Sequence, residues 1–168
     1  FKTITANGHT VDEHKKKMSK SLGNYVDTND MFATYGADAM RLNIIGSNFL
    51  KGEPVPIDTA GKVFGDTVKN IMTPLWNAYH FFTLYANAGN VTAKNVSVND
   101  AQNVMDKYIL IELNELTKIA NESMEIYEPY TFLRRVMEFL DILNNWYIRR
   151  SRERFWDEDQ DAFDTLYT

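Results

Sequence analysis

The feature that most constrains the fold is a series of three long segments in which apolar residues recur every three or four positions. These segments cover residues 60–88, 100–127 and 130–156. Such spacing gathers apolar side chains on one face of a helix, and three helices joined by short polar connections must bury those faces on one another. The sequence therefore predicts a mainly α protein built around a helical bundle.

Proline, glycine and capping residues predict where these helices bend, begin and end. Pro74 has no backbone donor and predicts a kink in the first helix, while Gly89 is a natural stop. Asp100 is predicted to cap the second helix. The apolar residues at 162–167 predict the first turns of a fourth helix. Because the sequence ends there, we expect a piece of a longer protein, with the helical domain truncated at its C-terminus.

The aromatic residues of these helices admit two interpretations, base stacking on a nucleic acid or packing in a core. Their spacing follows the apolar face of a helix, so core packing is the favoured interpretation. It applies to Tyr79, Phe81, Phe82, Tyr85, Trp146 and Tyr147. Apolar residues predicted to face inward on the first two helices include Phe64, Ile71, Leu75, Tyr79, Ile109, Leu116, Met124 and Tyr127.

Residues 1–56 have a different character. The pair Asn7-Gly8 separates the β-prone runs at 1–6 and 9–11, which predicts a β-hairpin. Asp30 and Asp38 are predicted to cap two short helices further along.

Glycine and proline residues at 52–56 then interrupt the helical pattern. We therefore predict a domain boundary after residue 56, with a helical domain over residues 57–168.

Composition narrows the classes of protein to which the chain can belong. It contains 168 residues and no cysteine, so it can form neither a disulfide nor a cysteine-ligated zinc site. We predict no metal site in it. No apolar run is long enough to span a membrane and no signal-peptide core is present, so we expect a cytoplasmic protein with no membrane partner.

Charge is distributed unevenly along the sequence. The net charge is −5, yet six of the seven arginines lie between Arg134 and Arg154. A local surplus of arginine is typical of phosphate contact, but it is equally typical of ordinary surface ion pairs, and both interpretations stay open. The candidate nucleic-acid contacts are Arg149, Arg150, Arg152 and Arg154.

A short basic string near the N-terminus carries the most specific chemical information. Lys17, Met18, Ser19, Lys20 and Ser21 spell KMSKS, and Leu22-Gly23-Asn24 follows. Two lysines on one loop can stabilise charge that develops on phosphate groups, and the serines add hydroxyl donors. The pentapeptide is therefore a candidate segment for binding phosphate groups. The alternative is a solvated lysine-rich loop.

The KMSKS string resembles the second signature of the class I aminoacyl-tRNA synthetases. The resemblance implies that Lys17 and Lys20 are catalytic residues and that Lys17, Met18, Ser19, Lys20 and Ser21 form an ATP-binding segment. The string YGADAMRL at 35–42 is similar to the segment that follows KMSKS in these enzymes. The strings PLWNAY at 74–79 and NWYIRRSRERFW at 145–156 resemble the isoleucine-specific branch. The valine, leucine and methionine enzymes share the first part of this pattern, so the third helix decides between the branches.

The resemblance implies a role for each part of the chain. Residues 1–56 would be the end of the catalytic domain, with the KMSKS loop and a helical stem-contact region, and residues 57–168 would be the anticodon-binding bundle. The partners would be tRNA(Ile), ATP with Mg²⁺, and isoleucine, in an enzyme that we expect to be monomeric. The His-Ile-Gly-His signature of the nucleotide-binding core is absent from the sequence. We therefore expect the chain alone to be inactive.

Two alternatives remain at this point. The chain could be a stand-alone helical module that binds RNA or protein, with an incidental lysine loop. It could also be a fragment of the related valine or leucine enzyme.

Overall fold

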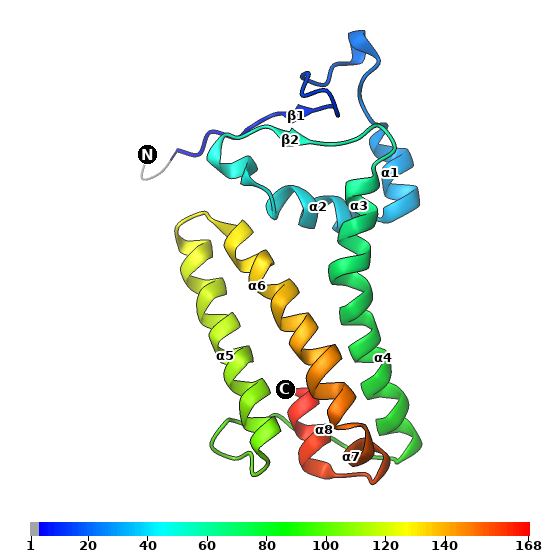
Figure 1. Ribbon diagram of the computed structural model, residues 1–168, viewed down its shortest axis with the longest axis vertical. Helices are drawn as coiled ribbons and strands as arrows, with labels where there is room; N and C mark the ends of the chain where they lie inside the picture. The colour runs from blue at the N-terminus through cyan, green and yellow to red at the C-terminus, as the bar shows by residue number, and fades with distance from the viewer. Residues whose placement is uncertain (1–3) are drawn as a thin grey trace. The chain divides into compact units, whose positions relative to one another are not determined.

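The computed structural model describes residues 4–168, and most of its elements are helices (Figure 1). The chain divides into two compact units. The first comprises Phe1–Met72 and Ala120–Arg134, and the second comprises Thr73–Ile119 and Arg135–Thr168. These compact units do not test the domain boundary predicted after residue 56, and that boundary stays a prediction.

The first unit is built from short elements around a small apolar core. They are β1 (Thr10–Val11), η1 (Lys20–Leu22), α1 (Thr28–Tyr35), α2 (Ala37–Ile45), η2 (Asn48–Lys51), β2 (Val55–Pro56), α3 (Lys62–Thr67) and the π-helical η3 (Val68–Met72). Ala39, Met40, Val55, Ile57 and Phe64 form the buried core, and Phe64 is fully buried. The apolar residues of α2, β2 and α3 therefore hold this unit together.

The strand pairing differs from the predicted hairpin. Thr10–Val11 pairs in parallel with Val55–Pro56, and residues 4–9 belong to no strand. Residues 1–3 of the predicted first strand lie outside the described residues. A two-residue hairpin turn of the common type needs positive φ at both central positions, and neither Asn7 nor Gly8 has it.

Gly8 has another structural reason to be glycine. Its N–H donates to Phe49 O at 2.8 Å, and a Cβ built on Gly8 would lie 1.8 Å from Glu53 O. Glycine at position 8 therefore lets the backbone approach the 49–53 segment closely. The hairpin prediction had assigned this glycine to a turn.

The first two helices begin close to where they were expected, but other residues cap them. Asp27, not Asp30, caps α1, and its carboxylate accepts from the N–H groups of Asn29 and Asp30. Gly36 stands at the start of α2, and Asp38 lies within the first turn, where it pairs with Arg41 at 2.8 Å.

The second unit is a helical assembly. It contains α4 (Thr73–Ala88), the larger part of α5 (Val104–Glu125) and of α6 (Pro129–Asp141), the π-helical η4 (Ile142–Ile148), α7 (Arg152–Trp156) and α8 (Gln160–Tyr167) (Figure 1). The π-helical η3 ends at Met72, two residues before Pro74, and the kink expected at Pro74 stays a prediction. The predicted stop at Gly89 and the predicted fourth helix are both confirmed. Asn103, not Asp100, provides the side-chain contact at the start of α5, accepting from Met105 N at 2.8 Å.

Aromatic packing forms the core of the second unit. The ring of Phe155 lies edge-on to Phe81 at 5.0 Å and to Phe163 at 5.1 Å, and Phe82 lies 6.2 Å from Phe163. Phe155, Phe163 and Tyr147 are almost entirely buried. The prediction of core packing is therefore confirmed for Phe81, Phe82 and Tyr147.

The predicted apolar faces contain four errors. Leu75 and Tyr79 of α4 are 57% exposed, while Ala78 and Ala86 are buried. Met124 and Tyr127 are also exposed, and Ser123 is buried near them. Large apolar residues were expected to lie inside, but the helices pack here through small side chains that allow close approach.

Among the described residues, no helix combines the length and the apolar character needed to cross a membrane.

Candidate functional site: the KMSKS loop and an arginine surface

The lysine-rich loop is held by backbone contacts to β1 and by one contact between side chains. Met18 N donates to Thr10 O at 3.1 Å, and Lys17 forms an isolated antiparallel bridge with Val11. Asp12 is 6% exposed and accepts a hydrogen bond from Asn24 Nδ2 at 2.8 Å. The loop from 12 to 24 is therefore closed by a contact between its first and last residues.

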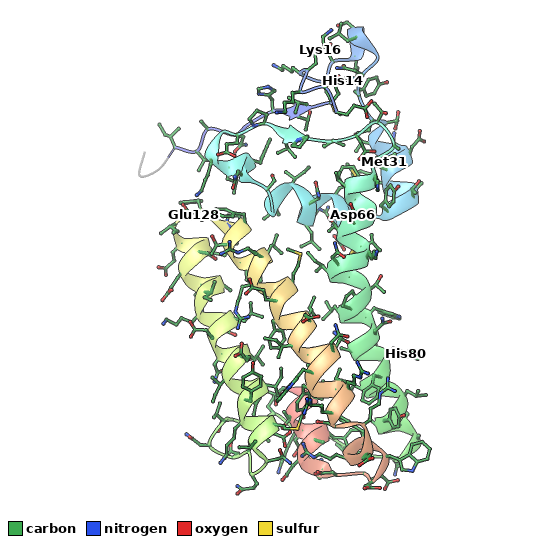
Figure 2. All side chains as sticks on the ribbon, in the orientation of Figure 1. His14, Lys16, Met31, Asp66, His80 and Glu128 are labelled. Carbon is green, nitrogen blue, oxygen red and sulfur yellow. The ribbon has the colours of Figure 1, made fainter. Side chains whose placement is uncertain are left out.

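The candidate ATP-binding residues lie together on this loop. Lys20 begins η1, and Ser19 and Ser21 share a hydrogen bond at 2.7 Å between their hydroxyl oxygens. The side chains of Lys17 and Lys20 are exposed. Gly23 has a φ of 64° and ends η1, so a residue with a Cβ would be strained there. His14 and Lys16 lie on the preceding turn of the same loop (Figure 2).

A pocket of about 500 Å³ opens beside the loop within the first unit. Met18, Ser19 and Lys20 line it from the loop, and Phe32, Met40 and Arg41 are among its other lining residues. Its walls are mostly apolar, and its lining residues include two with charged side chains, Lys20 and Arg41. The loop thus places one of the two candidate catalytic lysines at a concave surface.

The four candidate arginines belong to the second unit and do not share one environment. Arg149, Arg150 and Arg152 are exposed, and Arg150 lies over the Trp146 ring at 5.7 Å. Arg154 is different, because its side chain is only 18% exposed and pairs with two carboxylates. The first three are therefore free to reach a phosphate backbone, while the charge of Arg154 is already neutralised.

The partner of Arg154 is a buried carboxylate that sequence patterns did not single out. Asp106 is fully buried, accepts from Arg154 Nη1 at 2.6 Å and Nη2 at 2.7 Å, and accepts from the Tyr147 hydroxyl at 2.9 Å. Burial raises the pKa of Tyr147, and the charge of Asp106 raises it further. The hydrogen bond to Asp106 raises the pKa of Arg154. The tyrosine stays neutral and the arginine stays charged.

Asp159 extends this network at the start of α8. It accepts from Arg154 Nε at 2.7 Å and from the N–H groups of Asp161 and Ala162. Burial by itself raises the pKa of Asp159, but the hydrogen bond and charge of Arg154 outweigh it, so the pKa is lowered. No group of three or more His, Cys, Asp or Glu side chains gathers at metal-binding distance within residues 4–168.

Two known families match separate parts of the chain. Residues 1–55 match the tRNA synthetases of class I (I, L, M and V), and residues 106–168 match the anticodon-binding domain of tRNA ligase. The chain therefore belongs to the class I aminoacyl-tRNA synthetase family. Within that family it is similar over its whole length to proteins named isoleucine–tRNA ligase.

Three of these relatives come from Rickettsia. The chain is 42% identical to those of Rickettsia peacockii (strain Rustic), Rickettsia bellii (strain OSU 85-389) and Rickettsia prowazekii (strain Madrid E). Each match covers 100% of the chain but only 15–16% of the relative. The chain thus spans about a sixth of the length of these proteins.

A solved structure supports the fold. The agnB2 LeuRS of Agrobacterium radiobacter K84, crystallised in a ternary complex as LeuRS-tRNA-LeuAMS, superposes with a TM-score of 0.71 at 17% identity. The match covers 95% of this chain and 19% of that one. At this identity the likeness establishes the fold alone.

Proposed function

We propose that the chain is the part of an isoleucine–tRNA ligase that stabilises the phosphates of ATP and docks tRNA(Ile). The observation that carries the proposal is the KMSKS loop, which presents exposed Lys17 and Lys20 in a chain 42% identical over its full length to isoleucine–tRNA ligases. The reaction class is ATP-dependent ligation that begins with activation of the amino acid.

The chemistry of activation explains what the two lysines contribute. The isoleucine carboxylate attacks the α-phosphate of ATP, the bond to the β-phosphate breaks, and pyrophosphate leaves with negative charge. Lys17 and Lys20 supply positive charge where that negative charge grows, so they stabilise the transition state more than bound ATP. Binding of isoleucine and of the adenosine would fall to parts of the enzyme outside this chain.

Mg²⁺ accompanies ATP in the proposed enzyme. The described residues gather no carboxylate cluster for it, so we propose that the nucleotide phosphates and residues outside this chain hold the ion. When bound, it would neutralise part of the phosphate charge.

The second unit would carry the tRNA contact. Arg149, Arg150 and Arg152 are exposed on a family-matched anticodon-binding segment, and exposed guanidinium groups suit phosphate oxygens. Arg154 contributes to the fold of that segment through Asp106. The three exposed arginines would hold the tRNA backbone, leaving recognition of the anticodon bases to other groups.

The test is ATP–pyrophosphate exchange by the full-length enzyme that carries this chain. We expect exchange with isoleucine in preference to valine or leucine, and a loss on the order of 10²-fold for Lys20→Ala with little change in the KM for isoleucine. Lys16→Ala removes an exposed lysine of the same loop and serves as the matched control.

The 168-residue chain alone should give no exchange, because the nucleotide-binding core lies outside it. An undiminished rate in Lys20→Ala, or preference for valine or leucine, would contradict the proposal.

A further inference from the structure

We infer that Asp12 and Asn24 are positioning residues that hold the KMSKS loop in the conformation in which its lysines can act. The inference rests on the proposed function of the loop. It concerns two side chains that need not touch ATP and that act through the backbone they hold.

Asp12 organises the first turn of the loop. Its Oδ1 accepts from His14 N at 3.0 Å and from Lys16 N at 2.8 Å, while its Oδ2 accepts from Asn24 Nδ2 at 2.8 Å. The residue is 6% exposed. Hydrogen bonds to a nearly buried carboxylate are charge-assisted and strong, so this residue fixes the backbone that leads into the lysines.

Asn24 makes the complementary contacts from the other end. Its Oδ1 accepts from Ser19 N at 3.0 Å, and its Nδ2 also approaches Lys17 O at 3.3 Å. A single amide side chain therefore contacts the backbone on both sides of Met18, within the KMSKS string itself.

The chemistry of the pair fixes the orientation of the amide. An ionised carboxylate can only accept hydrogen bonds, so the Asn24 nitrogen must face Asp12. The amide oxygen then points to Ser19 N–H, which needs an acceptor. The hydrogen bond from Asn24 and the N–H of Lys16 lower the pKa of Asp12, so the carboxylate stays ionised at neutral pH. If the Asn24 amide were turned round, its oxygen would face the Asp12 carboxylate and its nitrogen would face the Ser19 N–H.

The Asp12–Asn24 pair, which we call the clamp, is separate from the lysine side chains that would contact the phosphates. Asp12 is nearly buried and Asn24 is half-buried, whereas Lys17 and Lys20 are exposed. A shift of the backbone at Lys17 or Ser19 would move the ammonium groups relative to the phosphates, and misplacement by about 1 Å can cost about 10²-fold in rate.

The test exchanges the two functional groups in the full-length enzyme. Asp12→Asn sets its new NH2 group against either the Asn24 amide nitrogen or the N–H groups of His14 and Lys16. Asn24→Asp sets two carboxylates against each other, so each variant should lower the rate of isoleucine-dependent ATP–pyrophosphate exchange by up to about 10²-fold. The double variant carrying both changes restores a donor facing an acceptor and retains an acceptor for Ser19 N–H, although it lacks the donor to Lys17 O. It should recover part of the lost rate. Asn24→Ser removes the amide without adding charge and covers the case in which Asn24→Asp does not fold.

A second comparison separates positioning from general stability. If the clamp acts through Lys20, then Asn24→Ser should cost little further rate in a Lys20→Ala background, while the KM for isoleucine and the melting temperature stay close to those of the parent.

Loss of rate in Lys20→Ala with full rate in the Asp12 and Asn24 variants would overturn this inference and leave the proposed function standing. Full rate in Lys20→Ala would overturn both. If the rate losses of Asn24→Ser and Lys20→Ala added fully when combined, the positioning role alone would be overturned. The same follows if the Asp12→Asn and Asn24→Asp double variant recovered no rate.

Discussion

The guanidinium of Arg154 donates hydrogen bonds to both carboxylate oxygens of Asp106, at 2.6 and 2.7 Å, although 48 residues separate the two in the sequence. Asp106 is fully buried in the second unit, and the Tyr147 hydroxyl is its third partner. The contact ties the start of α5 to η4 and α7. A buried charge is tolerated only when it is paired and hydrogen-bonded, so this carboxylate depends on its arginine.

Arg154→Leu should strongly destabilise the second unit. The change leaves Asp106 as an uncompensated buried charge, and breaking one partner of such a pair costs about 3–5 kcal/mol. Amide hydrogen exchange in the full-length enzyme, followed on α5 and α7, measures the loss.

Arg152→Leu is the matched control, because Arg152 lies on the same helix but is exposed. It should change exchange on α5 and α7 little. Equal protection in the two variants would show that the Asp106 pair contributes nothing to the fold.

The stability of the second unit should depend on the charge of Asp159 at acidic pH. Its folded-state pKa lies below 3.8, the value of an unperturbed aspartate, because Arg154 outweighs the effect of burial. A lowered pKa stabilises the folded state above the unfolded value, and this contribution is lost as the pH falls through the folded pKa.

Asp159→Asn keeps an acceptor for the first turn of α8 but removes this linkage. We expect the urea midpoint to fall less steeply in the variant between about pH 5 and about pH 2, followed by tryptophan fluorescence. Asp161→Asn removes an exposed carboxylate from the same turn and controls for net charge. Parallel curves for Asp159→Asn and the parent would refute the linkage.

Replacing Arg149, Arg150 and Arg152 together with Gln should weaken tRNA binding and flatten its salt dependence. Each phosphate contact releases counterions, so losing three contacts should reduce the slope of log affinity against log salt by about 2–3. The measurement is a titration of tRNA(Ile) into the full-length enzyme at several salt concentrations.

The matched control is the replacement of Lys94, Lys107 and Lys118 with Gln, which removes the same charge from exposed positions of the same unit. If tRNA binding depended only on the overall positive charge of this unit, both triple variants would show the same change in the slope of log affinity against log salt. In that case the arginines are solvated side chains, and another surface holds the tRNA.

The pattern of the sequence predicted the helices well because their information is local. Residues three and four apart meet on one helix face, and the stop at Gly89 and the start of α8 depend on neighbours in sequence. The KMSKS string is likewise read from adjacent letters. The same approach failed at Leu75 and Tyr79, where packing through Ala78 and Ala86 took precedence over side-chain size.

The sequence by itself determined a mainly helical chain, a lysine loop suited to phosphate charge and an arginine-rich segment near the C-terminus. The single helix predicted over residues 130–156 divides into α6, η4 and α7 in the structure. Only the tertiary structure decided that Thr10–Val11 pairs with Val55–Pro56 and that Asp12 accepts a hydrogen bond from Asn24. It also decided that Arg154 pairs with Asp106, while the other three candidate arginines stay exposed. Periodicity and motifs are properties of neighbouring residues. The partner of a strand edge or of a buried charge comes from distant sequence, and it is fixed by which groups the packed core leaves in need of a hydrogen bond.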